Sequence, residues 1–557
     1  MTAGVHFALF TPAALGGLLM LLATGWTLRD VQANTPESVL GWKWWLLCAL
    51  AVLCFRWPLL FVQHQLNPDE SQLIAGAITL RHDPVFWRSV DGNTGGPLDY
   101  YPLFPAAWVT GPSSFVVARL IGLAVTFAAL LLAGETLALL AGASLARVVV
   151  LPALAAAAFT TCPDFVFYSS ETMPTLLLAA AAYAAVRQGR TPAPGWLWAT
   201  ALLLGGVPWT KLQAVPLAAV LWLLVVIREY RAGRTSSLLP LLIGGLLPTL
   251  FCAGFATISG QWENLYVPYV LQNVVYVGDP HFSWTENAAQ QGLNAFSDGY
   301  LGFWLAGAAG AALVIGSRYV RSASPATRRL ALAALGLFAV AVYSALAPRR
   351  PSAHHLQFLV VPWVWLTGAV LALAWTAATD ATAAGRRRWV AISFLACTLV
   401  PLGAWRLAGH DAYAGMNADV LSPARQRLSL LVDRYSAPGE TLAIWGWRCS
   451  LYVEAGRPQA TRQAHTEPQI HPGPFQGYYL RRYFDDFRAA NAPVFADAVG
   501  PGGFAFTDRD RAHECFPPLR AWVRDHYTQI ADLDGTRLYV RNDRLTAGNS
   551  AHRDDSR

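Results

Sequence analysis

The stretch Asn67-Pro68-Asp69-Glu70 opens a long polar loop, residues 63–114, between two apolar runs. Two adjacent carboxylates at the mouth of a membrane helix are costly unless they meet water, a cation or a substrate. Pro68 restricts the backbone, and the residues after it predict a short helix that continues through Leu80. Asp69 is then either the N-cap of this helix or a chemically active carboxylate. These residues alone leave both interpretations open.

The composition is that of a membrane protein. Of 557 residues, 54% are hydrophobic and only 13% are charged, and 22 are tryptophans. Apolar runs long enough to cross a bilayer recur as far as residue 408, after which charged residues return. We therefore expect an α-helical polytopic membrane domain over 1–408 and a soluble α/β domain over 409–557. The expected spans number about twelve: 5–27, 42–62, 115–140, 148–161, 172–186, 195–209, 212–227, 238–258, 299–315, 330–347, 356–376 and 389–407.

Basic residues set the expected orientation. They fall in every second short connection, which by the positive-inside rule lies in the cytoplasm. The loop 63–114 and the C-terminal domain are then extracytoplasmic. The net charge of +7 reports this topology, so no nucleic-acid partner is expected. The basic connections contain Arg29 and Lys43, Arg147, Arg187 and Arg190, Arg228 to Arg234, Arg318 to Arg329, and Arg386 to Arg388.

The C-terminal domain shows both helical and strand patterns. We expect helices at 421–435, 478–490 and 516–527, and strands at 441–447, 493–499 and 537–541. No glycine-rich phosphate loop follows a strand, so no nucleotide site is expected. Cys449 and Cys515 could pair if the domain faces an oxidising compartment.

Two charged residues stand at expected outer membrane boundaries. Glu171 lies in Tyr168-Ser169-Ser170-Glu171-Thr172-Met173-Pro174, where an acid that favours the start of a helix is the alternative explanation. Lys211 is the only lysine after Lys43. The basic residues of every later inside connection are arginines, so a lysine at an outer boundary stands apart from them. A snorkelling side chain is the alternative explanation for Lys211.

Further cations lie on the same expected face. Arg119 stands several residues inside the third apolar run, at its outer end. Arg349, Arg350, His354 and His355 fall in one outer connection, against the positive-inside rule. Such a group suits an anion, most simply a phosphate, and a solvated loop is the alternative.

Carboxylates and cations on one face suit a reaction with a base and an anionic leaving group. Sugar transfer from a polyprenyl phosphate meets that description. Asp69 would take the proton of an acceptor hydroxyl, and the cations would stabilise the departing lipid phosphate. No metal ligands are assigned, and a divalent cation is optional.

Four motifs resemble the C-type (GT-C) glycosyltransferase superfamily. They are the early Asp-Glu pair, the Tyr-Ser-Ser-Glu-x-x-Pro segment, the Thr-Lys pair at Lys211 and the Arg-x-x-x-His segment. Over residues 42–408 the sequence is most similar to the bacterial protein O-mannosyltransferase and lipid A aminoarabinose transferase branch, the family 39-like glycosyltransferases. The resemblance implies a lipid-phosphate-sugar donor, inversion at the anomeric carbon and an extracytoplasmic active site.

The resemblance also implies roles for individual residues. Asp69, with Glu70 beside it, matches the first catalytic acid, and Glu171 matches the second. Lys211 matches a lipid-phosphate contact, and Arg350 with His354 or His355 matches another. The sequence departs from the pattern in having Glu rather than Asp at 171 and one apolar run before the similar region. The C-terminal domain carries no acceptor motif, so the acceptor stays open.

Two other functions compete with this interpretation. A transporter or flippase for a lipid-linked or anionic solute would place its charges near the bilayer midplane, often in two related halves. The sequence shows no internal repeat, and its polar residues gather at one surface. A non-catalytic membrane protein of polysaccharide assembly is the third candidate.

The alternating basic connections predict the topology directly. A reporter fused after Leu407 should be extracytoplasmic, and one fused within 318–329 should be cytoplasmic. Paired alkaline phosphatase and fluorescent-protein fusions measure this. If both positions lie on the same side, the orientation assigned to every site residue is wrong.

Overall fold

The structure, a computed structural model, describes residues 2–33, 39–278, 281–297, 300–377, 382–408 and 423–545. Its contacts divide the chain into two compact units. Unit 1 comprises Met1–Leu60, Gly122–Cys252 and Tyr276–Tyr413, and unit 2 comprises Phe61–Ile121, Ala253–Val275 and Ala414–Arg557. The domain boundary expected at residue 409 falls in 409–422, outside the described residues.

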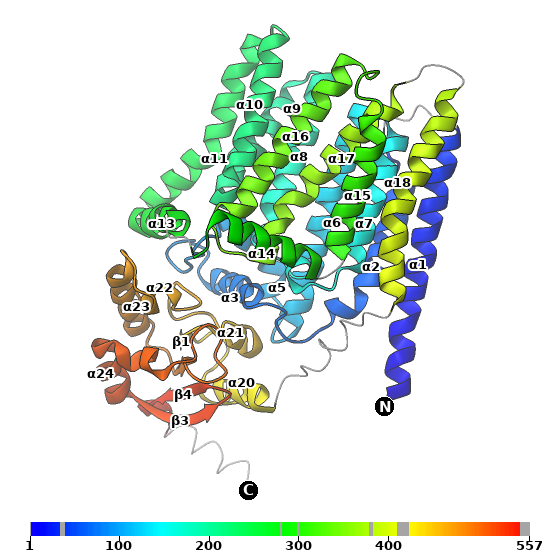
Figure 1. The fold of residues 1–557 in the computed structure, drawn as a ribbon. Helices are drawn as coiled ribbons and strands as arrows, with labels where there is room; N and C mark the ends of the chain where they lie inside the picture. The colour runs from blue at the N-terminus through cyan, green and yellow to red at the C-terminus, as the bar shows by residue number, and fades with distance from the viewer. Residues whose placement is uncertain are drawn as a thin grey trace. The chain divides into compact units, whose positions relative to one another are not determined.

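Long apolar helices dominate the fold (Figure 1). Each of the twelve expected spans falls on one of them. In the described part of the chain, eight helices are long and apolar enough to cross a membrane. The α-helical polytopic class is therefore confirmed, while the number of spans stays a prediction. The helices are α1 (Thr2–Ala33), α2 (Trp42–Leu60), α6 (Ser113–Ala141), α7 (Ala143–Phe159), α8 (Thr172–Arg190), α9 (Pro194–Gly206), α10 (Val215–Arg231), α11 (Leu238–Ile258), α15 (Tyr300–Ser317), α16 (Pro325–Leu346), α17 (Gln357–Trp375) and α18 (Thr382–Leu407).

Small residues and one buried ion pair hold unit 1 together. A Cβ on Gly205 of α9 would lie 2.2 Å from the carbonyl oxygen of Gly245 in α11, so only glycine permits this close approach. Arg147 of α7 is 2% exposed and pairs with Asp30 of α1. Arg147 was expected in a basic cytoplasmic connection, and the structure shows that its charge is buried and paired.

None of the twelve expected spans falls in the segment 259–298. In the described residues it forms short pieces: α12 (Trp262–Leu265), a π-helical turn at Tyr266–Leu271, α13 (Gln272–Gly278) and α14 (Trp284–Ser297). Trp262 and Tyr266 stack with ring centroids 6.4 Å apart, and both are exposed. None of these pieces is among the eight helices that could cross a membrane.

The C-terminal part of unit 2 is α/β, as expected. Its four-stranded sheet has the order β1-β2-β4-β3, with β1 and β2 parallel and the other pairs antiparallel. The strands are β1 (Leu442–Trp445), β2 (Val494–Asp497), β3 (Tyr527–Leu533) and β4 (Thr536–Arg541), and the main helices are α20 (Pro423–Tyr435), α21 (Ser450–Ala455), α23 (Gln476–Ala490) and α24 (Pro517–His526). Strand β3 was not anticipated, because it lies at the sheet edge and its residues are exposed or half-buried except for Tyr527.

Successive residues of β1 point to opposite faces of this sheet. Leu442 and Ile444 join one apolar cluster, while Ala443 and Trp445 join the other. The first cluster also contains Ala75 of the loop helix α3 (Pro68–His82). Helix α3 packs beside α21 (Figure 1), so the helix that carries Asp69 in its first turn belongs to the core of the C-terminal sheet.

Polar contacts join the same loop to the C-terminal residues within unit 2. Arg482 of α23 forms a buried ion pair with Asp91. Asn93 lies 2.8 Å from the Nε2 atom of His465. The backbone N–H of Gln459 donates to the Thr79 hydroxyl at 3.0 Å. The loop and the C-terminal sheet are therefore one folded unit.

This shared core predicts that a change in α3 destabilises the C-terminal sheet. Ala75→Phe inserts a ring where the side chain is fully buried, and overpacking of this kind costs about 1–3 kcal/mol. Limited proteolysis across a temperature series should show earlier cleavage of the C-terminal domain. Ala288→Phe on the exposed side of α14 is the matched control and should behave as wild type. Unchanged protection in the Ala75 variant would mean that α3 does not support the sheet.

Candidate functional site

The N-terminus of α3 sets the position of Asp69. The side chain of Asn67 accepts a hydrogen bond from the backbone N–H of Asp69 at 2.9 Å, and Pro68 occupies the first turn. The N-cap is therefore Asn67, and the alternative that Asp69 caps this helix is wrong. Asp69 is half-buried in the first turn, where the helix dipole favours its negative charge.

Glu70 and Arg119 lie together in the interior of unit 2. Arg119 donates from Nε to Oε1 of Glu70 at 2.7 Å and from Nη2 to Oε2 at 2.8 Å. The same guanidinium also donates to the carbonyls of Val62 and His64. Both side chains are at most 1% exposed. The catalytic role expected for Glu70 and the substrate contact expected for Arg119 stay predictions, and the contacts formed here anchor the first turn of α3.

Lys211 and Glu171 form a second buried pair, in unit 1. Lys211 stands in extended backbone between two 3₁₀ turns, where α9 ends and α10 is about to begin. Its ammonium donates to a carboxylate oxygen of Glu171 and, at 2.7 Å, to the hydroxyl of Ser170. Lys211 is 5% exposed and Glu171 is fully buried, so neither is a solvated or snorkelling side chain.

The surroundings keep Glu171 ionised. Burial alone would raise its pKa, but Lys211, His354 and His355 together hold the pKa below its ordinary value. A carboxylate with a lowered pKa and an ammonium partner is a poor proton acceptor at neutral pH. It is well suited to fixing the position of the Lys211 ammonium.

Two histidines complete the group that we call the Glu171 cluster: Asp164, Ser170, Glu171, Lys211, His354, His355 and Gln357. His354 Nδ1 lies 3.1 Å from Oδ1 of Asp164, and the rings of His354 and His355 are 4.7 Å apart. Gln357 donates to the Asp164 carbonyl at 2.7 Å and to the Ser169 hydroxyl at 2.9 Å. Asp164 and Gln357 are not among the residues expected from sequence, although both lie within a few residues of expected positions.

Glu171, His354 and His355 each place one ligand atom within 4.8 Å of the others. By atom type this set suits a divalent transition metal. The Glu171 carboxylate, however, already has the Lys211 ammonium as its partner, and a metal would compete with that ammonium. The set does not fit a cation while this ion pair is formed, and no step is assigned to a metal.

Arg349 and Arg350 are held by aromatic rings. The guanidinium carbon of Arg349 lies 5.7 Å from the centroid of Trp284, and that of Arg350 lies 4.4 Å from the centroid of Tyr276. Both side chains are half-buried, and among the described residues neither forms an ion pair. Arg349 has φ +49°, a left-handed conformation that turns the chain at this point. These two cations are therefore suited to an anion from outside the protein.

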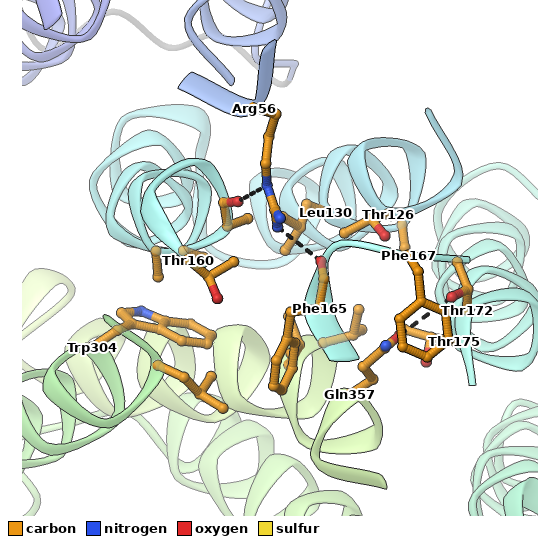
Figure 2. Close-up of a pocket in the computed structure, with 17 residues that line it drawn as sticks. Arg56, Thr126, Leu130, Thr160, Phe165, Phe167, Thr172, Thr175, Trp304 and Gln357 are labelled. Atoms are coloured by element: carbon orange, nitrogen blue, oxygen red, sulfur yellow. Dashed lines mark hydrogen bonds between the residues drawn. The ribbon is translucent and has the colours of Figure 1, made fainter. Parts of the chain in front are cut away.

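A mostly apolar cavity adjoins the Glu171 cluster in unit 1 (Figure 2). The space open to the centre of a water molecule is about 50 Å³. Arg56 projects along one wall and donates to the carbonyls of Ala157 at 2.7 Å and Phe165 at 2.8 Å. Gln357 and Thr172 line both the cavity and the polar network, and their side chains are hydrogen-bonded to each other. Gln357 therefore links the cavity to the Glu171 cluster, and the charged side chain in the cavity wall itself is Arg56.

Comparison with solved structures identifies the fold. The crystal structure of ArnT from Cupriavidus metallidurans bound to undecaprenyl phosphate superposes with a TM-score of 0.56 at 14% identity, covering 89% of this chain and 98% of that chain. The apo form of ArnT superposes with a TM-score of 0.52 at 13% identity, covering 89% and 97%. The expected GT-C fold is therefore confirmed. No family model matches the sequence, and no curated protein matches it.

The buried pair of Lys211 and Glu171 leads to a testable prediction about stability. Lys211→Met leaves the Glu171 carboxylate buried without its counter-charge, which should lower the free energy of unfolding by about 3–5 kcal/mol. The double variant Lys211→Met/Glu171→Gln removes both charges and should recover most of that loss. Thermal unfolding followed by tryptophan fluorescence measures both.

Lys43→Met changes the only other lysine, which is exposed, and serves as the matched control. A double variant as unstable as the single one would show that the two side chains do not compensate each other.

Proposed function

We propose that this protein is an inner-membrane glycosyltransferase that moves a sugar from a polyprenyl-phosphate donor to an extracytoplasmic acceptor. The observation that carries the proposal is the Glu171 cluster, which contains a buried lysine and two histidines and which shares Gln357 with an apolar cavity. A lipid phosphate has both an anionic head and an apolar chain, so it matches both halves of this arrangement. The structural neighbour bound to undecaprenyl phosphate supports the same ligand class.

The donor phosphate is assigned to the cations of unit 1. Lys211 and the arginines at 349 and 350 would neutralise the charge that builds up as the bond from the anomeric carbon to the phosphate oxygen breaks. Glu171 would keep the Lys211 ammonium in place throughout. These side chains would supply the positive charge that stabilises the departing lipid phosphate. The apolar cavity beside Gln357 would take the first isoprenoid units of the lipid.

The acceptor is assigned to Asp69. Its carboxylate would take the proton of the acceptor hydroxyl as the oxygen forms a bond to the anomeric carbon. Direct displacement of the lipid phosphate inverts the configuration at that carbon. Glu70 is not needed as the base, because both of its oxygens accept hydrogen bonds from Arg119.

This assignment predicts a specific defect for Asp69→Asn. The substitution preserves size and removes the proton acceptor, so turnover should fall by about 10²–10⁴-fold, the usual contribution of a general base. Thermal stability and donor binding should change little, because Asn67 still caps the helix. The measurement is the loss of radiolabel from a panel of polyprenyl-phosphate sugars, at saturating donor.

Asp485→Asn, on the exposed side of α23, is the matched control and should keep full activity. Full activity of the Asp69 variant would remove this residue from the mechanism. If the wild-type protein released label from none of the donors, the transferase proposal itself would fail.

A further inference from the structure

One end of the helix bundle in unit 1 carries a group of arginines that the proposed reaction does not use. Four of them lie between the end of α15 and the first turns of α16, and three lie in the first turns of α18. We call this group the arginine patch: Arg318, Arg321, Arg328, Arg329 and Arg386 to Arg388. It lies at the end of the bundle that is expected to face the cytoplasm.

Two contacts bring the separate segments of the patch together. The guanidinium carbon of Arg386 lies 5.4 Å from the ring centroid of Tyr319, which follows α15. Arg387 donates from Nε to the carbonyl of Trp375, the last residue of α17, at 3.3 Å. The adjoining ends of α15, α16, α17 and α18 therefore form one surface (Figure 1).

This surface has almost no negative charge of its own. The described residues 300–377 and 382–408 contain no Asp or Glu, and Asp380 is the only acidic residue between positions 299 and 410 of the sequence. Seven arginines and one aspartate leave a net charge of +6. Five members are exposed and form no ion pair with any described residue: Arg318, Arg321, Arg328, Arg329 and Arg388.

Other arginines at the same end of the bundle are neutralised within the protein. Arg147 pairs with Asp30. Glu229 of α10 is fully buried and pairs with both Arg228 and Arg234. The arginine patch differs from these pairs, because like charges that stand close together repel one another. It is therefore suited to an anion from outside the chain.

Exposed apolar side chains adjoin the arginines on helices that could cross a membrane. On α16, Leu332 follows Arg328 by four residues and is 67% exposed. On α18, Ile392 follows Arg388 by four residues and is 46% exposed. Residues four apart lie on the same face of a helix, so each arginine stands one turn from an apolar side chain that faces lipid. Trp389 is also exposed, and tryptophan favours the boundary between lipid and water.

The arginine patch is separate from the Glu171 cluster. Helix α17 begins at Gln357, within that cluster, and ends at Trp375, beside the patch. Its 19 residues span roughly 28 Å at 1.5 Å per residue, close to the thickness of the hydrocarbon core of a bilayer. The two groups of charges therefore lie at opposite ends of the bundle.

We propose that the arginine patch binds the headgroup of an acidic phospholipid, whose acyl chains lie along the exposed apolar faces of α16 and α18. The phosphate accepts charge-assisted hydrogen bonds from the exposed guanidinium groups. A soluble anion matches the charges but not the apolar faces, and a zwitterionic lipid brings a cation of its own. The inference goes beyond the proposed transfer reaction, because this binding needs neither the sugar donor nor Asp69.

Binding is measured by native mass spectrometry on the full-length protein in detergent, without any sugar donor. Phosphatidylglycerol and phosphatidylcholine with the same acyl chains are titrated separately. Phosphatidylglycerol should bind at least tenfold more tightly, because each arginine near a membrane surface adds to the attraction for an anionic headgroup. Glycerol phosphate in large excess should not displace it, since this soluble anion has no acyl chains.

Arg328→Gln/Arg329→Gln should weaken phosphatidylglycerol binding at least tenfold and leave phosphatidylcholine binding unchanged. Both side chains are exposed and unpaired among the described residues, so thermal stability should equal that of the wild type. Arg328→Lys/Arg329→Lys keeps the charge and should bind phosphatidylglycerol within about threefold of the wild type. Arg190→Gln/Arg231→Gln removes two exposed arginines from other connections at the same end, and this matched control should bind normally.

Reporter fusions check that the variants keep the wild-type topology, because arginines also orient membrane helices. Should Arg328→Gln/Arg329→Gln insert wrongly, Arg388→Gln removes one charge of the patch and should weaken phosphatidylglycerol binding about fivefold.

Four results would overturn the proposal. They are equal affinity for the two phospholipids, unchanged phosphatidylglycerol affinity in a correctly inserted patch variant, an equal loss in the matched control, and displacement of the lipid by glycerol phosphate. Unchanged affinity in the patch variant would place the bound lipid elsewhere, for example at the Glu171 cluster. None of these results bears on whether the protein consumes a polyprenyl-phosphate sugar.

Discussion

The ion pair between Arg119 and Glu70 is the interaction on which the position of the loop helix depends. It joins the start of α6 to the first turn of α3, and the same guanidinium holds the carbonyls of Val62 and His64. A buried pair of this kind adds little net stability over apolar residues of similar volume, but loss of one partner is expensive. The pair therefore specifies how the first turn of α3 is placed against the start of α6. The neighbouring Asp69 is presented on a fixed backbone, and its side chain is spared from capping because Asn67 takes that role.

A buried charge needs a partner, and this requirement separates structural charges from candidate binding charges in both units. Arg147 pairs with Asp30, Lys211 with Glu171 and, in unit 2, Arg482 with Asp91. Each of these side chains is buried or nearly so, where an uncompensated charge would be prohibitive. Arg349 and Arg350 differ, because aromatic rings hold them and leave their charge for a ligand. Lys211 is fixed by Glu171, in a cluster whose Gln357 also lines the apolar cavity of unit 1. A lipid phosphate that reached it would meet a cation already held in place.

The C-terminal domain gains a structural role from the shared core. Ala75 of α3 packs with the sheet residues, and Asp91 and Asn93 of the same loop contact α23 and His465. The first-loop helix and the soluble domain therefore fold as one body within unit 2. From sequence alone, the loop 63–114 belongs to the expected membrane domain 1–408. Hydropathy reports only whether a segment is polar, and it does not reveal which distant segment that polar loop will pack against.

The sequence by itself determined the helical membrane class, the position of each long helix, the loop helix after Pro68 and most of the C-terminal elements. These are local properties, because apolar length and side-chain period are summed over neighbouring residues. Only the tertiary structure decided which charges meet. Glu70 and Arg119 are 49 residues apart in the chain, Glu171 and Lys211 are 40 apart, and Asp91 and Arg482 are 391 apart. An ion pair is chosen by the distance between two side chains in the folded protein and by their exclusion from water, and a sequence read along its length contains neither quantity.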